Sequence, residues 1–119
     1  MISLKKVIEK IGLEPISAVG EVNRPVIGGY ASDLLSCAMR GAKKDFLWVT
    51  LQSHANVVAV ASLLNLAGVV ITEGNRPGPE IISQAEAEGV VLLLSTRDTF
   101  SVVGELTAMG IAGETGSPA

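Results

Sequence analysis

The sequence predicts an α/β domain in which helices cover both faces of a mainly parallel sheet. Three compact apolar runs, Phe46–Leu51, Ala67–Thr72 and Val90–Ser95, have the length and composition of buried strands. Each is followed by a polar step and a helical stretch, as crossovers between parallel strands require. Apolar residues make up 48% of the 119 residues and aromatics only 3%, so the core has to be aliphatic. We expect a single three-layer domain whose sheet has roughly four to five strands.

The N-terminal third adds a helix and two short extended pieces. Ser3 is a suitable N-cap for a helix over residues 4–11, and Gly12 is well placed to end it. Residues 15–20 read as a short strand at a sheet edge, because Pro15 cannot donate a ladder hydrogen bond. Residues 26–30 are a second short extended piece.

Four further helices follow from apolar periodicity and capping residues. The first is predicted to begin near Ser32 and to stop around Gly41. The other three are predicted to span residues 54–65, 79–88 and 98–109. The 54–65 helix is apolar on nearly every side, so we expect it to pack on the sheet and on another helix or subunit. This helix and the small size of the domain predict a homodimer.

Composition narrows the function classes. The formal net charge is −3, with no basic stripe or cluster of stacking aromatics, so no nucleic-acid partner is expected. No apolar run reaches the roughly 18 residues of a membrane helix, and the N-terminus lacks the pattern of a signal peptide. Cys37 is the only cysteine, consistent with a reducing, cytoplasmic setting. We expect residues 1–119 to form one domain with a flexible tail at 111–119.

Ligands of parallel α/β sheets bind outside the carboxyl ends of the strands, so the loops at those ends are the candidate site. They gather polar and small residues, among them the chain's only histidine and only tyrosine. With helix N-termini and with Arg76 and Arg97, this set fits a small anionic ligand. The proposed site residues are Gly28, Gly29, Tyr30, Ser32, Asp33, Gln52, His54, Asn56, Arg76 and Thr96.

Each of these residues also has a structural interpretation. Gly28 and Gly29 would permit a turn with positive φ, and Ser32 and Asp33 are ordinary N-cap residues. His54 would cap a helix or bond a neighbouring loop. The two arginines would be solvated or would pair with Glu73 and Asp98.

No constellation of residues indicates catalysis. The sequence contains no G-x-x-x-x-G-K-[ST] loop, no G-x-S-x-G elbow and no G-x-G-x-x-G after a strand. One histidine and one cysteine do not supply a typical zinc site. We therefore expect no enzyme activity, cofactor or metal. A small enzyme that uses His54 and Asp33 as an acid–base pair is a further hypothesis for the function, beside metabolite sensing and docking onto a partner protein.

Three segments together resemble the DRTGG domain family: Val26–Ser36, Trp48–Asn56 and Val58–Ser62. The resemblance covers about residues 15–110 and implies an α/β domain similar to the N-terminal domain of HPr kinase/phosphorylase. Members accompany CBS pairs and phosphotransacetylase or stand alone, which implies a regulatory role. The kinase chemistry belongs to a separate P-loop domain that this chain lacks. Asn75–Gly78 is the nearest local match to the family's Asp-Arg-Thr-Gly-Gly.

Two function classes remain open. The first is a non-catalytic regulatory domain that senses a nucleotide or other anionic metabolite. The alternative is an interaction module that docks onto a metabolic enzyme or kinase. A hollowed polar rim favours sensing, whereas a flat apolar face favours docking.

Overall fold

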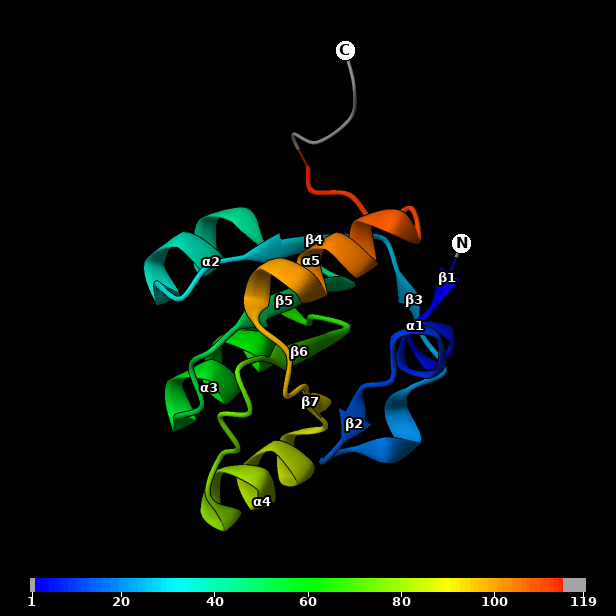
Figure 1. The fold of residues 1–119 in the computed structure, drawn as a ribbon. Helices are drawn as coiled ribbons and strands as arrows, with labels where there is room; N and C mark the ends of the chain where they lie inside the picture. Colours follow the sequence, from blue (N-terminus) through cyan, green and yellow to red (C-terminus); the bar gives the residue numbers. More distant parts are fainter. Residues whose placement is uncertain (1, 115–119) are drawn as a thin grey trace.

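A five-stranded sheet with strand order β2-β7-β6-β5-β4 forms the centre of the protein (Figure 1). The computed structural model describes residues 2–114. Four strands are parallel, and the edge strand β2 is antiparallel to β7. A separate pair, β1 and β3, is also antiparallel. The bounds are β1 Ile2–Ser3, β2 Glu14–Pro15, β3 Pro25–Val26, β4 Gly28–Ala31, β5 Phe46–Thr50, β6 Gly68–Ile71 and β7 Leu92–Leu94.

Helices cover both faces of this sheet, as predicted. The parallel strands β4, β5, β6 and β7 are neighbours in the sheet in the same order as in the chain. The right-handed crossovers between them therefore place α2, α3 and α4 on one face. Contacts of α3 with α2 and with α4 agree with this placement. Helices α1 and α5 contact each other on the opposite face. The bounds are α1 Leu4–Ile11, α2 Leu35–Gly41, α3 Ala55–Leu64, α4 Pro79–Glu88 and α5 Thr99–Ala108, with a 3₁₀ turn at Val19–Glu21.

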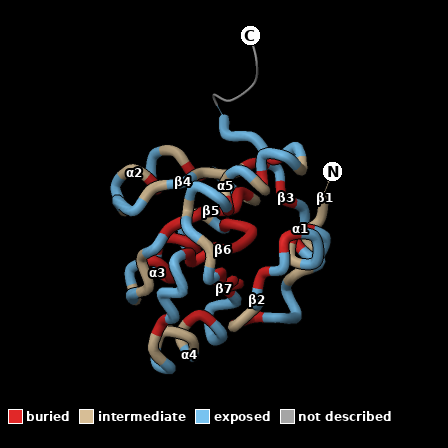
Figure 2. Tube along the Cα trace, in the orientation of Figure 1, coloured by how far each residue is buried: buried red, intermediate tan, exposed pale blue. Residues whose placement is uncertain are grey.

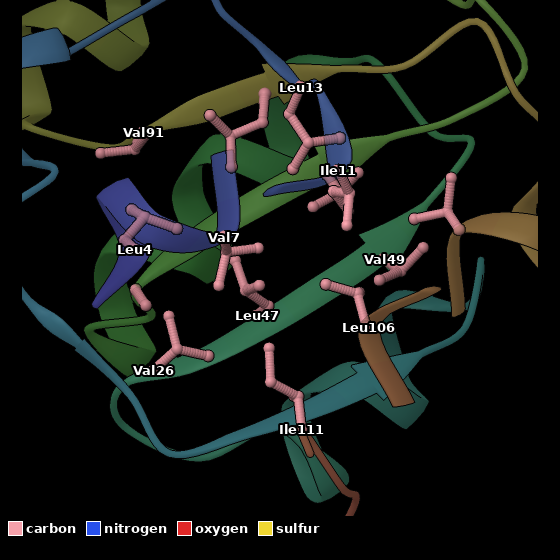
Figure 3. Close-up of a cluster of buried hydrophobic side chains, with 14 of the residues drawn as sticks. Leu4, Val7, Ile11, Leu13, Val26, Leu47, Val49, Val91, Leu106 and Ile111 are labelled. Carbon is pink, nitrogen blue, oxygen red and sulfur yellow. The ribbon is translucent and has the colours of Figure 1, made fainter. Parts of the chain in front are cut away.

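The hydrophobic core is divided into two clusters by the sheet. Leu47 and Val49 of β5 pack with α1 and α5, whereas Phe46 and Trp48 pack with the helices of the other face. Figure 3 shows the first cluster, with Leu47 and Val49 beside residues of α1 and α5. Figure 2 shows buried residues concentrated on the central strands. The alternation along β5 follows from the two-residue period of a strand.

Two predicted boundaries are wrong, each for a local reason. The strand expected over residues 15–20 is only Glu14–Pro15, because the buried Ser17 hydroxyl donates to Val90 O and accepts from Leu92 N in place of a regular ladder. The helix expected near Ser32 begins at Leu35. The Asp33 carboxylate is bonded to Thr50 at the end of β5 and to Leu51 just after it, which keeps residues 32–34 out of the helix.

The expected turn at Gly28 and Gly29 is also wrong. Both glycines lie inside β4, and neither has a positive φ. A Cβ on Gly28 would lie 2.6 Å from the Phe46 ring and 3.0 Å from Ala112 O. The backbone of β4 therefore approaches its neighbours too closely for a side chain at this position.

The apolar surface of α3 is mostly accounted for within the chain. Val57, Val58, Val60 and Ala61 are buried between the sheet and the neighbouring helices, whereas Leu63 remains 71% exposed. The homodimer stays a prediction. Less apolar surface of α3 is left for a contact with a second subunit than the sequence indicates.

The C-terminal region expected to be flexible begins with packed residues. Ile111 is buried, and Ala112 O accepts from Gly29 N at 3.1 Å. Residues 115–119 of the predicted tail lie outside the described residues. Within residues 2–114, no helix is long and apolar enough to span a membrane.

Candidate functional site

The loops that follow β4, β5, β6 and β7 meet at one end of the sheet, as predicted. We call this end the rim and define it as residues 32–34, 51–54, 72–78 and 95–98. Hydrogen bonds join successive loops: Thr72 N donates to Thr50 O, and the Asn75 amide donates to Leu51 O. Gly74 N donates to Ser95 O. The rim is therefore a connected set of loops.

Asp33 organises the part of the rim nearest β4. Its Oδ1 accepts from the buried Thr50 hydroxyl at 2.8 Å and from Leu51 N at 2.9 Å. Gln52 Nε2 donates to Asp33 O at 3.2 Å. Ser32 O accepts from Trp48 Nε1, and Ser32 Oγ accepts from Leu34 N. Three predicted site residues, Ser32, Asp33 and Gln52, therefore lie together in one hydrogen-bond network.

The start of α5 is held to the loop after β6. The Thr72 and Thr99 hydroxyls are 2.6 Å apart, and Glu73 Oε2 accepts from Thr99 N at 3.0 Å. Asp98 is the N-cap, and its carboxylate accepts from Ser101 N and Ser101 Oγ. These bonds to Ser101 hold the pKa of Asp98 below its usual value. The carboxylates of Glu73 and Asp98 thus accept hydrogen bonds from backbone N–H groups in the first turn of α5.

Replacing Asp98 with asparagine should lower the melting temperature at neutral pH, because the charged form caps α5 better than the neutral amide. A lowered pKa in the folded state stabilises the protein above the unfolded value of 3.8, and this contribution is lost as the pH falls through the lowered pKa. Thermal unfolding of both proteins across pH 2–7 measures the difference. A gap between them that persisted in acid would contradict this role of the charge.

The two arginines expected near the rim, Arg76 of the predicted site and Arg97, bind different partners in the structure. Arg76 Nη1 forms an exposed ion pair with Glu14 Oε2 of β2 at 3.2 Å. Arg97 is directed away from the rim, toward the Glu105 carboxylate and Ile11 O. The alternative pairings with Glu73 and Asp98 are wrong, because those carboxylates accept from the start of α5. Of the two cations expected at the rim, only Arg76 is available to a ligand there.

The histidine stands at the start of α3 and is not paired with the rim carboxylate. His54 is the N-cap residue of α3 and makes no side-chain capping bond, and His54 and Asn56 are exposed. The Asp33 carboxylate bonds to Thr50 and Leu51 instead, so the geometry does not assemble a His54–Asp33 acid–base pair. Thr96 is exposed beside Gly74. Within residues 2–114, no three His, Cys, Asp or Glu side chains gather as a metal site would require.

The predicted site residues of β4 lie away from the loops. Gly29 and Tyr30 line a hollow of about 80 Å³ between β4 and α5, together with the C-terminal segment 111–113. The Tyr30 ring also fills the space beside Gly41, where a Cβ would lie 2.2 Å from it. The small residues Gly29 and Ala31 leave room under α5. These residues shape a sheet edge and do not form a ligand-binding turn.

The model of the DRTGG domain matches residues 24–109. This chain belongs to the DRTGG domain family. No curated protein matches the chain.

This DRTGG domain is also similar to a solved structure, the CBS and DRTGG domains of the regulatory region of Clostridium perfringens pyrophosphatase, which is complexed with its activator diadenosine tetraphosphate. The TM-score is 0.67 at 12% sequence identity. The match covers 95% of this chain and 51% of that chain, so the DRTGG domain spans about half the length of its structural neighbour. At this identity the likeness shows a shared fold.

Sequence reasoning missed several residues that shape the rim of this DRTGG domain. Glu14 holds Arg76, Asn75 joins the loops after β5 and β6, and Thr72 is bonded to Thr99. Glu14 and Asn75 each act on a residue distant in the chain, and no local pattern marks them. A polar residue directly after a buried strand, as at Thr72, was the one available signal.

Proposed function

We propose that this DRTGG domain is a non-catalytic regulatory domain that senses a small anionic metabolite, such as a nucleotide, at the rim. The observation that carries the proposal is the start of α3. No side chain caps its first turn, and the exposed His54 and Asn56 stand beside it. Backbone N–H groups at a helix N-terminus favour an anion, and polar side chains at the same point would orient it.

Arg76 would supply the cation. Its ion pair with Glu14 is a single exposed contact, and such pairs contribute about 0–1 kcal/mol. A phosphate would therefore compete for the guanidinium at little cost. Gln52 and Thr96 are the remaining rim side chains proposed to contact the ligand. Ser32 and Asp33 would hold the loops in place.

The structural neighbour supports the ligand class. That protein is the regulatory region of a pyrophosphatase, and its activator is a dinucleoside polyphosphate. The same class of ligand, with several phosphates of high negative charge, suits a helix N-terminus and an arginine. A cytoplasmic setting, where nucleotides are abundant, is part of this proposal, as is the homodimer.

Thermal unfolding with a ligand panel tests the proposal. The panel is ATP, AMP, diadenosine tetraphosphate, acetyl phosphate and glucose 6-phosphate. A ligand present at 100 times its Kd adds about 2.7 kcal/mol of stability, which raises the melting temperature by several degrees. We expect a rise with at least one nucleotide and about tenfold weaker binding in Arg76→Ala, because a hydrogen bond to a charged group is lost.

The matched control is Arg40→Ala, which removes the same charge from an exposed site on α2, away from the rim. Binding should be unchanged in this variant. Equal weakening in both variants would show a general charge effect, and no shift with any member of the panel would contradict sensing of these metabolite classes.

The second candidate function is docking onto a partner protein such as a metabolic enzyme or kinase. It is favoured by one observation: Phe100, at the start of α5, is 90% exposed. Large apolar side chains this exposed often mark interaction sites when they are grouped.

A further inference from the structure

We propose that Glu14 is an autoinhibitory residue of the rim: its carboxylate holds the Arg76 guanidinium in the free domain and has to leave it when an anionic ligand binds. The observation behind this inference is the ion pair between Arg76 Nη1 and Glu14 Oε2, which are 3.2 Å apart. The inference rests on the proposed function, because it assigns the regulation of the same site. It adds a residue outside the rim, and it names β2 as the element that responds to the ligand.

Glu14 reaches Arg76 because the segments between them are bonded to one another. β2 pairs with β7, and Glu14 lies opposite Leu94 in this pair. Ser95 follows Leu94 directly, and its carbonyl oxygen accepts from Gly74 N, two residues before Arg76. Figure 1 shows β2 beside β7 at the edge of the sheet. The loop that carries Arg76 is therefore fixed next to the strand that carries Glu14.

The contact with Glu14 leaves most of the guanidinium open to a competitor. Within residues 2–114 it is the one side-chain hydrogen bond of Arg76, and it uses a single nitrogen. The side chains of Arg76 and Glu14 are 53% and 58% exposed, so a dissolved anion can reach both. A phosphate can accept two parallel N–H bonds from an arginine, which is a stronger arrangement than one bond to a carboxylate. Since a phosphate and a carboxylate repel each other at short distance, the ligand displaces Glu14 and does not bind beside it.

Release of Glu14 loosens β2. This strand has only two residues and lies at the edge of the sheet, where it pairs with β7 alone. Arg97 holds the end of α1 through Ile11 O, and Arg76 holds β2 through Glu14. Ligand binding removes the second of these bonds and leaves the first. The order of the short segment 12–15 therefore depends on whether the rim is occupied.

The affinity of Glu14→Gln for the five compounds of the ligand panel tests the proposal. This variant removes the charge and keeps the size of the side chain. Exposed ion pairs are weak, so a compound that binds the wild-type chain should bind Glu14→Gln about two- to fivefold more tightly. Salt screens exposed charges, so this ratio should shrink toward one at high salt. Titration calorimetry on the full chain at low and high salt measures the dissociation constants.

A double-mutant cycle shows whether Glu14 acts through Arg76. In an Arg76→Ala background the guanidinium is absent, so Glu14→Gln should leave the remaining affinity unchanged. The matched control is Glu21→Gln, which removes the same charge from an exposed site in the 3₁₀ turn. It should leave the affinity of the wild-type chain unchanged.

Hydrogen exchange measures the response of β2, which an effect on affinity alone would not change. A bound panel compound at saturation should raise deuterium uptake in residues 12–16 of the wild-type chain. Glu14→Gln should show raised uptake without any ligand, because the charge-assisted bond to Arg76 is already lost.

The outcomes separate this inference from the proposed function. Binding that depends on Arg76 but is equally tight in Glu14→Gln would overturn the inference and leave the proposed function standing. An equal gain of affinity in the wild-type and Arg76→Ala backgrounds would also overturn it, because Glu14 would then act by general repulsion. Unchanged exchange in residues 12–16 with ligand bound would show that β2 is not released. Absence of binding by all five compounds, to the wild-type chain and to Glu14→Gln alike, would overturn both proposals.

Discussion

Replacing Trp48 with alanine is expected to lower the free energy of unfolding by about 3–5 kcal/mol. Trp48 lies in the middle of β5 and is fully buried. Truncating its side chain therefore leaves a cavity between the sheet and the helices that cover this face, α2 to α4. The variant also removes the Nε1 donor to Ser32 O, a bond of 2.9 Å that fixes the loop before α2. Since small domains are stable by only about 5–15 kcal/mol, this variant should be close to unfolding. Urea denaturation measures the loss.

Trp48→Phe separates packing from hydrogen bonding. It keeps an aromatic ring in the core but loses the N–H donor, so its cost should be clearly smaller than that of alanine, about 1–3 kcal/mol. If the alanine variant lost less than about 1 kcal/mol, the central position of Trp48 would be contradicted. If the phenylalanine variant lost as much as alanine, the bond to Ser32 would be the dominant contribution.

The sequence predicts the central fold well because its signals are local. The apolar runs of β5, β6 and β7 need no distant information, and capping residues define the ends of α1 at Ser3 and Gly12. Helix α4 begins at Pro79 and ends before Gly89, as expected for a proline at the first turn and a left-handed glycine. The convergence of the loops at one rim then follows from parallel topology alone.

What the sequence does not predict are interactions between distant residues. Arg97 and Asp98 are neighbours in the chain, yet Arg97 pairs with Glu105 and Asp98 caps its own helix. Arg76 is held by Glu14, whose position depends on β2 joining the sheet beside β7. The sequence does not predict that Phe100 is exposed. Its helix is apolar overall, and periodicity alone does not identify which apolar residue faces outward.

Gly28→Ala is expected to cost about 1–3 kcal/mol of stability, through overpacking of a close-packed site. The new Cβ would lie 2.6 Å and 2.7 Å from two carbons of the Phe46 ring and 3.0 Å from Ala112 O. The ring is buried and the carbonyl belongs to the backbone, so neither can move away easily. Guanidinium denaturation measures the change.

Gly29→Ala is the matched control, one residue along the same strand. Its Cβ would lie 3.4 Å from Ile111 Cγ2 and 3.7 Å from Leu47 O, which are ordinary contacts or nearly so. With no positive φ to strain, it should change stability by less than about 1 kcal/mol, since reduced freedom of the unfolded chain offsets part of any cost. A phosphate-binding turn would show a different pattern, with stability retained and ligand affinity lost in both variants. A stability loss confined to Gly28 therefore assigns the glycine pair to the packing of β4 against Phe46 and the C-terminal segment.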